Sequence, residues 1–132
     1  MNFVLEKYHV LGNDYLVYDP EKNNMDLKKE VIQAICSRHF GVGADGVLVG
    51  PIYKDTQIWL KIFNPDGSEA EISGNGISIF AKYLRDAGYI QKSHLKFQTL
   101  SGEVEAFYKN EDGSKLKISM GKRSEERRVG KE

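Results

Sequence analysis

A short polar segment, Ser73-Gly74-Asn75-Gly76, stands directly before a run of residues with helical spacing. The first N–H groups of a helix have no partner within the helix, and together they carry about half a positive charge. Glycines on both sides of Asn75 would let a ligand carboxylate approach these groups closely, and the Asn75 amide can both donate and accept hydrogen bonds. Ser73 would add a hydroxyl beside this anion site. The arrangement suits an amino acid held by its α-carboxylate, with an acid/base group at Cα.

An ordinary capped loop would produce the same pattern. Serine and asparagine are preferred N-cap residues, so the segment needs no ligand to explain it, and capped loops are the commoner case. Asn13 and Asn64 stand beside turns, where asparagine side chains commonly bond their own backbone. Arg38, near a predicted helix end, would complement the helix dipole. His9 and His39 have the character of core or surface histidines.

Two predicted helices would position these residues. Apolar residues at helical spacing predict a helix over residues 27–40, with Asp26 as its N-cap and Gly41 ending it in a left-handed conformation. A second helix is predicted from about Ile77 to Ala87, with Gly88 ending it. Its polar residues form one narrow stripe, and a helix that is apolar over the rest of its circumference is typically buried. The stripe consists of Ser78, Lys82, Arg85 and Asp86.

Short strand-like runs make up most of the remaining chain. They cover residues 2–8, 14–18, 47–49, 57–63, 94–100, 103–108 and 115–120, with turn residues between them. Many short strands and one nearly apolar helix predict an α+β fold: an antiparallel β-barrel wrapped around a central helix, rather than a parallel βαβ sheet.

The segment Gly41-Val42-Gly43-Ala44-Asp45-Gly46 matches the pattern GxGxxG. A dinucleotide fingerprint follows a strand and opens a helix, which aims helix N–H groups at a pyrophosphate. Here the predicted helix comes first and the strand follows. The order therefore favours a glycine-rich loop between helix and strand over a nucleotide site.

Composition excludes several function classes. The chain has 132 residues, of which 40% are hydrophobic and 29% charged, and its formal net charge is zero. This balance gives no electrostatic basis for a nucleic-acid or membrane partner. The single cysteine, Cys36, cannot form an internal disulfide or a zinc cluster. The N-terminus lacks the apolar stretch of a signal peptide and no run is long enough to span a bilayer, so we expect a cytoplasmic protein.

The last ten residues differ in character from the rest. Residues 123–132 read RSEERRVGKE, with one apolar side chain and no periodicity, which predicts a solvated or disordered end. They are similar to the in-frame translation of a common sequencing-adapter oligonucleotide. We therefore interpret 123–132 as an artefactual tail and 1–122 as the authentic domain. On this interpretation the natural C-terminal part of the protein is missing.

Four segments together resemble the diaminopimelate epimerase family. They are HVLGNDYLVYD (residues 9–19), SRHFGVGADGVL (37–48), IFNPDGSEAEISGNG (62–76) and FAKYLRDAG (80–88). They occur in the family's order and at about its spacing, over roughly residues 3–120, or about half of a family member. The resemblance implies two similar α/β halves, each a barrel around a central helix, with the active site between them. Residues 1–122 would be the N-terminal half.

The resemblance also implies an activity. It is the interconversion of L,L- and meso-2,6-diaminopimelate in lysine biosynthesis, without pyridoxal phosphate, metal or other cofactor. In the family one cysteine from each half exchanges a proton at Cα, and the first of them corresponds to Ser73. Gly74 and Asn75 match residues that hold the α-carboxylate and amine, while Asn13 and Asn64 match substrate contacts. The small-molecule substrate would be the main partner, the complete protein a homodimer, and the present fragment inactive without the second acid/base.

Ser73 leaves three interpretations open. A serine hydroxyl is a far weaker acid than a thiol and needs a neighbouring base. Ser78 is a second departure, since the family usually has arginine there. The chain could belong to a serine-type epimerase, or to an isomerase of the same fold with another amino-acid substrate; it could be a non-catalytic relative that binds an amino acid; or it could carry an engineered Cys→Ser substitution, which the second change at Ser78 disfavours.

Overall fold

One continuous sheet and two helices make up the fold of the described residues. The computed structural model describes the chain except for residues 1–3, 25, 40, 72–73, 121–122 and 132, and of residues 123–127 it describes the backbone. The strands are β1 Leu5–Val10, β2 Asn13–Tyr18, β3 Gly46–Lys54, β4 Gln57–Phe63, β5 His94–Thr99, β6 Gly102–Tyr108, β7 Lys115–Met120, β8 Arg123–Arg128 and β9 Gly130–Lys131. The helices are α1 Lys29–Cys36 and α2 Gly74–Asp86. The strand order is β8-β7-β6-β5-β4-β3-β2-β1-β9.

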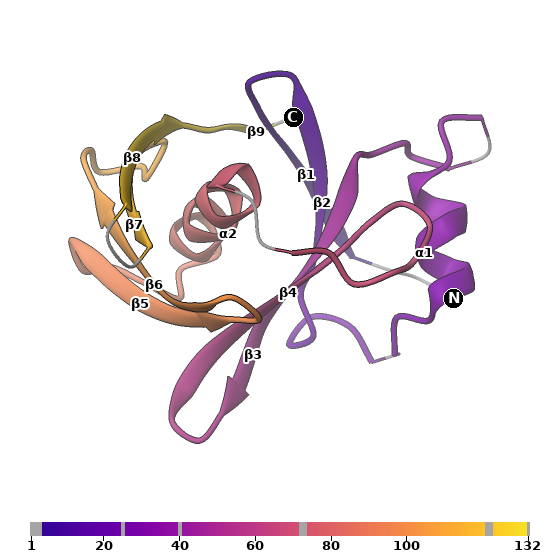
Figure 1. The fold of residues 1–132 in the computed structure, drawn as a ribbon, viewed down its shortest axis with the longest axis horizontal. Coiled ribbons are helices and arrows are strands. Elements are labelled where there is room, and N and C mark those ends of the chain that lie inside the picture. Colours follow the sequence, from indigo (N-terminus) through magenta and orange to yellow (C-terminus); the bar gives the residue numbers. More distant parts are fainter. Residues whose placement is uncertain (1–3, 25, 40, 72–73, 121–122, 132) are drawn as a thin grey trace.

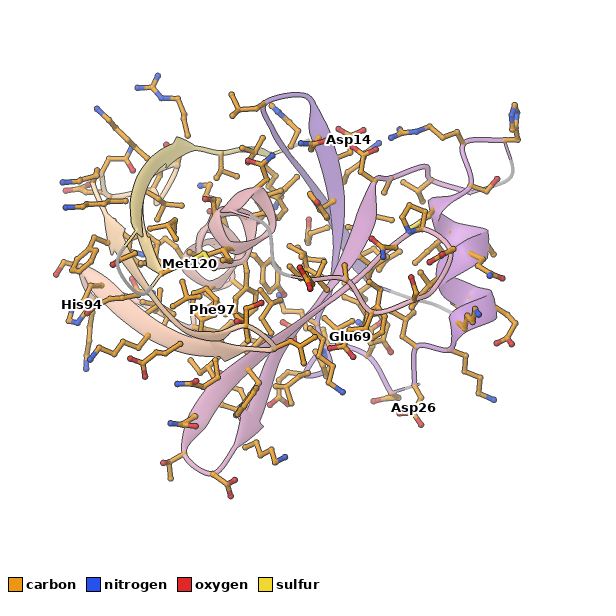
Figure 2. The ribbon with its side chains drawn as sticks, in the orientation of Figure 1. Asp14, Asp26, Glu69, His94, Phe97 and Met120 are labelled. Atoms are coloured by element: carbon orange, nitrogen blue, oxygen red, sulfur yellow. The ribbon has the colours of Figure 1, made fainter. Side chains whose placement is uncertain are left out.

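The sheet curls around α2, which occupies the inside of the molecule (Figure 1). Ile77, Phe80 and Leu84 of this helix have no exposed surface. Phe80 meets Phe97 of β5 edge to face, with ring centroids 5.0 Å apart, and Figure 2 shows Phe97 on the inner side of the sheet. The prediction of a barrel-like half around a buried central helix is confirmed.

Two strand pairs run parallel, which the expected antiparallel barrel did not include. These pairs are β2–β3 and β4–β5, and the chain between each pair contains a helix, α1 or α2 respectively. Parallel neighbours need such a crossover connection, whereas antiparallel neighbours can be joined by a tight turn. Residue periodicity predicts the type of an element but carries no information on the direction of its neighbour.

The other helix, α1, covers the outer face of the sheet. Its buried residues Ile32 and Cys36 belong to a second apolar cluster with Leu16 of β2 and Val47 of β3. The next residues along these strands, such as Val17, point to the α2 side. The central strands are thus covered on both faces, which is typical of strands that read as nearly continuous apolar runs.

The bounds of α1 differ from the prediction. The helix covers 29–36 rather than 27–40, and its N-cap is Lys28, without a side-chain capping hydrogen bond, so the prediction of Asp26 is wrong. It ends early because Ser37 is extended, with ψ 129°. Gly41 is needed for a different reason from the one predicted: a Cβ there would collide with the Ala34 carbonyl oxygen. The left-handed position in this loop belongs to Gly43, with φ +82°.

The bounds of α2 shift by three residues at the N-terminal end and by one at the C-terminal end, where the helix ends at Asp86 rather than Ala87. It begins at Gly74, three residues before the predicted Ile77, so the glycines around Asn75 form its first turn. Gly88 follows its end with φ +83°, as predicted for a residue that stops a helix. Within the described residues, no helix is both long and apolar enough to cross a membrane.

The polar stripe of α2 finds its partners inside the barrel. Lys82 Nζ donates to Asp86 Oδ1 at 2.7 Å and to the Asp112 carbonyl oxygen at 2.6 Å, and the Tyr8 hydroxyl donates to Asp86 Oδ2 at 2.7 Å. The Arg85 guanidinium lies 4.0 Å from the centre of the Tyr108 ring. The stripe therefore fixes the rotation of α2 within the barrel, because buried polar groups need specific partners.

The end of the chain is paired in the structure, whereas composition predicted a solvated or disordered end. β8 pairs with β7 from Arg123↔Met120 to Arg128↔Lys115, and β9 pairs with β1. Val129 between them is 3% exposed and belongs to the main core. Strand pairing uses backbone groups, so a segment with few apolar side chains can still extend a sheet. The interpretation of 123–132 as an artefact stays a prediction.

Candidate functional site

Three strands bring the sequence-predicted residues to one edge of the sheet. β2 begins at Asn13 and β3 begins at Gly46, and the two run parallel, with Tyr15 beside Gly46. β4 ends at Phe63, which lies beside Val47 of the antiparallel β3. The start of β2, the start of β3 and the end of β4 therefore meet at the same edge. Asn13 and Asn64, which are 51 positions apart in sequence, leave the sheet there.

The first turn of α2 lies close to this edge. The Ala70 N–H donates to the Ile62 carbonyl oxygen at 2.8 Å, and Glu69, labelled in Figure 2, forms a bridge with Phe63. Gly74 follows Ala70 by four residues, which span at most about 14 Å of extended chain. A short segment therefore leads from this edge of the sheet to the N-terminus of α2.

Asn75 carries a polar atom without a partner. Gly74 and Asn75 are half-buried and Gly76 is buried, so the helix starts at the margin of the core. Asn75 Oδ1 is buried and accepts no hydrogen bond from the described residues. Leaving a buried acceptor without a donor costs about 1–3 kcal/mol. A ligand that brings an N–H donor to this atom and a carboxylate to the helix N-terminus would satisfy both.

Ser73, the acid/base residue predicted from the sequence, lies outside the described residues. The structure therefore does not test whether His9 or His39 could act as its base. His9 and His39 are both exposed. The only cysteine, Cys36, lies on the other face of the sheet in the α1 cluster. Burial raises the pKa of its thiol above the ordinary value. Cys36 therefore offers no thiolate to the start of α2.

The side chain of Asn64 is partly used by a turn. Its Nδ2 donates to Ser68 Oγ at 3.0 Å, and Asp66 Oδ1 accepts from both the backbone and the hydroxyl of Ser68. These bonds lower the pKa of the Asp66 carboxyl. Asn64 thus stabilises its own turn, as we expected for an asparagine beside a turn.

The same five-residue pattern, Asn-x-Asp-Gly-Ser, recurs at 110–114 and has the same bonds. One difference separates the two turns. Asn110 Oδ1 accepts from the Lys115 N–H at 3.1 Å, but no described residue donates to Asn64 Oδ1. The turn therefore provides a hydrogen-bond partner for Asn64 Nδ2 only. The Oδ1 atom of Asn64 can accept a hydrogen bond from a ligand at the sheet edge.

Asn13 stands beside an ion-pair cluster that sequence reasoning missed. Arg38 bridges Asp14 Oδ2 at 3.3 Å and Asp45 Oδ1 at 3.1 Å. The two aspartates also exchange backbone contacts: the Asp14 N–H donates to Asp45 Oδ2 and the Asp45 N–H to the Asp14 carbonyl oxygen, both at 2.8 Å. Arg38 thus joins two loops at the sheet edge instead of complementing a helix dipole.

Metal ligands do not gather in the described part of the chain. It contains no group of three or more histidine, cysteine, aspartate or glutamate side chains that could hold a metal ion. The arrangement that remains is a set of hydrogen-bonding groups at a helix N-terminus. It can bind and orient a zwitterion.

Comparison with known proteins gives the chain a family context. The diaminopimelate epimerase family model matches residues 5–125. The chain is 48% identical over 117 residues to diaminopimelate epimerase 2 of a Nostoc species, covering 88% of this chain and 41% of that protein. It is 44% identical over 119 residues to diaminopimelate epimerase of Methanocella arvoryzae, covering 88% and 42% respectively. The chain thus spans about two-fifths of the length of these relatives.

Solved structures share the fold at low identity. A hydroxyproline epimerase from Agrobacterium vitis superposes with a TM-score of 0.63 at 16% identity, covering 88% of this chain and 40% of that one. A phenazine biosynthesis protein of the PhzF family from Bacillus anthracis gives 0.65 at 22% identity, covering 89% and 40%. In both, the matched region is less than half of the neighbour.

Proposed function

The chain belongs to the diaminopimelate epimerase family, and we propose that it supplies the half of an amino-acid epimerase site that holds the α-carboxylate and α-ammonium groups. The complete protein would interconvert L,L- and meso-2,6-diaminopimelate by two-base proton transfer at Cα. This chain would serve one face of Cα. The other face would be served by the part of the protein that lies outside the sequence.

The observation that carries this proposal is the unpartnered oxygen of Asn75 at the start of α2. An α-ammonium group is a charged donor, and a bond to it satisfies Asn75 Oδ1 with more than a neutral bond's strength. The helix N-terminus favours the adjacent carboxylate. An amino acid presents these two groups on neighbouring atoms, with Cα between them. Binding by both groups therefore holds Cα at a fixed position beside the helix start.

Asn13 and Asn64 extend the site along the sheet edge. Asn64 Oδ1, left open by its turn, is an acceptor for a further ligand donor. Asn13 at the start of β2 is half-buried, and the Arg38 cluster fixes the residue next to it. A ligand with a second polar end, such as diaminopimelate, can reach contacts of this kind, whereas a small apolar amino acid cannot. Two amides at some distance from the helix start thus favour a long, polar amino acid.

Ser73 is the proposed proton carrier for this face. It immediately precedes Gly74, so its hydroxyl belongs beside the ligand Cα. To remove a proton, a serine hydroxyl must first be deprotonated by a neighbouring base. A cysteine thiol has a lower pKa and can ionise without such a base. The Cα carbanion is itself strongly basic and can take the proton of the hydroxyl; the alkoxide that remains then takes a proton from solvent water. We therefore assign Ser73 to the donor step, with removal of the proton assigned to the other half.

The serine also favours a second candidate, a relative that binds an amino acid without isomerising it. Such a protein would keep Gly74, Asn75 and Asn64 as binding groups and would need no acid/base at residue 73. An isomerase with another amino-acid substrate is a further variant of the main proposal. Substrate identity and Cα exchange separate these candidates.

We infer the remaining properties of the complete protein from the family to which the chain belongs. We assign the complete protein to lysine biosynthesis in the cytoplasm, working as a homodimer without pyridoxal phosphate. Light scattering of the complete protein would report its mass, and a monomer would contradict the dimer. Undiminished activity after treatment with hydroxylamine, which removes bound pyridoxal phosphate, would support the cofactor assignment.

The decisive experiment is solvent exchange at Cα. The complete protein is incubated with L,L-diaminopimelate in deuterated water, and deuterium at Cα is followed by mass spectrometry. We expect uptake with the complete protein and none with the 132-residue chain, since one face then lacks its acid/base. Binding without exchange in the complete protein would instead identify the non-catalytic relative.

Matched asparagine variants test the site itself. Asn75→Ala should weaken ligand binding about tenfold, because a hydrogen bond to a charged group contributes about 1.5–3 kcal/mol. Asn110→Ala removes an asparagine from the equivalent turn, which contacts Lys82 and Arg85 in the C-terminal half of α2 rather than its first turn, and should leave binding unchanged. Equal effects of the two variants would contradict the assignment of Asn75.

A further inference from the structure

We propose that Ser78 is a positioning residue of this site: its hydroxyl holds the Gly74–Asn75 peptide unit so that the Asn75 N–H faces the ligand carboxylate. The inference rests on the proposed function, because it concerns the same ligand groups. It adds a residue that touches no ligand. It acts through the backbone of the first turn of α2.

The evidence begins with the surroundings of Ser78. The residue has no exposed surface, and its Oγ donates to the Gly74 carbonyl oxygen at 2.8 Å. In an α-helix the same oxygen also accepts the backbone N–H four residues later, which is that of Ser78. Residue 78 therefore binds the Gly74 carbonyl twice, with its backbone and with its side chain.

The geometry of the peptide bond links this oxygen to the site. The carbonyl of Gly74 and the N–H of Asn75 belong to one planar trans unit, in which the C=O and the N–H point in opposite directions. The carbonyl points along the helix toward Ser78, so the N–H points out of the helix N-terminus. Fixing one end of the unit fixes the other. The hydroxyl of Ser78 thus sets the direction of a donor that lies about one turn away from it.

Glycine makes this second anchor necessary. Gly74 has no Cβ and can populate a wide range of backbone angles, and it is the first helical residue, so only one side of it is held by the helix. The peptide unit that follows it would otherwise tilt easily. Asn75 also carries the unpartnered Oδ1, and its backbone orientation determines where that oxygen lies. One buried hydroxyl therefore orders the donor for the carboxylate and the acceptor for the ammonium group.

A purely structural role predicts a different outcome on substitution. Serine bonded back to the carbonyl four residues earlier slightly destabilises a helix, and alanine is the better helix former. Ser78→Ala leaves the backbone bond to Gly74 in place. Its midpoint of thermal unfolding should therefore equal or exceed that of the unmodified chain. A gain or no change in stability together with a loss of binding separates positioning from folding.

The experiment titrates the 132-residue chain with L,L-diaminopimelate and follows the Asn75 amide by two-dimensional NMR. Ser78→Ala should raise the dissociation constant about fivefold, the size expected for one hydrogen bond. Thr99→Val is the matched control, since Thr99 is also buried and its hydroxyl donates to the Gly102 carbonyl oxygen at 2.7 Å in the β5–β6 turn. The control should leave the dissociation constant within twofold. Equal dissociation constants for Ser78→Ala and the unmodified chain would overturn the inference.

A ligand-free arm keeps the two proposals distinguishable. The NMR order parameter of the Asn75 amide should fall in Ser78→Ala, because its peptide unit is then less firmly held, and should stay unchanged in Thr99→Val. If the unmodified chain binds no ligand, the proposed function of this chain is contradicted, while the order parameter still tests Ser78. An unchanged order parameter at Asn75 in Ser78→Ala would overturn the positioning role whatever the binding result.

Discussion

At the scale of single residues, three asparagines differ in how many of their amide atoms have a hydrogen-bond partner among the described residues. Asn110 uses both ends of its amide within its own turn, while Asn64 uses only its Nδ2, and Asn75 Oδ1 has no described partner. Identical residue types therefore differ in what they can offer a ligand. The difference arises from backbone geometry: the hairpin at 110–114 continues into β7 and presents an N–H to Asn110, whereas the loop after Asn64 turns away toward α2.

Cys36 gives a pH-dependent prediction at this scale. Its pKa is raised because the thiol is buried, so less thiolate is present at any given pH than for an exposed cysteine. Modification by a disulfide reagent should therefore be slow at pH 7 and should accelerate only above the ordinary thiol pKa of about 8.5. The chain unfolded in urea is the control and should react fast at pH 8. Rapid modification of the folded chain at pH 7 would contradict the burial and the raised pKa of the Cys36 thiol.

The same raised pKa fixes the sign of a stability effect. A group whose folded pKa exceeds its unfolded pKa contributes stability that is complete below the unfolded value and is lost as pH rises through the folded value. For Cys36 that loss begins above about pH 8.5. Cys36→Ala should remove this alkaline component. It should leave Cα exchange by the complete protein unchanged, because the thiol lies on the opposite face of the sheet from α2.

At the scale of elements, the polar stripe of α2 explains how one helix holds its orientation. The Lys82 side chain is 9% exposed and that of Asp86 is 23% exposed, so this pair is largely removed from water. Around it, Tyr8 comes from β1 and Asp112 from the β6–β7 turn, which connects α2 to both arms of the curled sheet. The rotation that satisfies these groups also turns Phe80 toward Phe97.

Lys82→Met tests this connection. The substitution keeps most of the side-chain volume but leaves the Asp86 carboxylate without its cation, and it should lower the free energy of unfolding by about 2–3 kcal/mol, somewhat less than for a fully buried pair. Lys96→Met, at an exposed position of β5, is the matched control and should change stability by less than about 0.5 kcal/mol. Urea unfolding followed by circular dichroism measures both. Similar values for the two variants would show that the stripe does not orient α2.

At the scale of the whole molecule, the two ends of the sheet are brought together by consecutive residues. β8 lies at one end of the strand order and β9 at the other, with Val129 between them (Figure 1). The chain thus passes from one end of the sheet to the other across the open side of the barrel. Val129 joins the core around α2 at this point.

Val129→Ala tests whether the segment from β8 to β9 closes the open side of the barrel. If it does, loss of two buried methyl groups should cost about 1–2 kcal/mol of unfolding free energy. Val42→Ala, at a residue with 56% exposure, is the control and should have little effect. No change for Val129→Ala would mean that the closure is not formed. That result would agree with the interpretation of residues 123–132 as an artefactual tail.

The sequence by itself determined the family and the two helices of the described residues, and it indicated the start of α2 as the candidate site. The reason is that these depend on local patterns: glycines around Asn75, the narrow polar stripe of a buried helix, and turn residues between strand-like runs. It also placed the glycine-rich loop between α1 and β3 correctly, because the order of helix and strand is readable from periodicity. The errors in α1 had a local cause too, since the extended backbone of Ser37 ends the helix despite continued apolar spacing.

Only the tertiary structure decided which distant residues share an edge. The parallel pairing of β2 with β3 brings Asp14 to Asp45 and lets Arg38 bridge them, and periodicity carries no information on strand direction. Together with the pairing of β3 and β4, it places Asn13 and Asn64 at one edge of the sheet, from which a short segment leads to α2. The bond from Ser78 to Gly74 and the unpartnered oxygen of Asn75 also required coordinates, because hydrogen bonds depend on where buried atoms lie after packing.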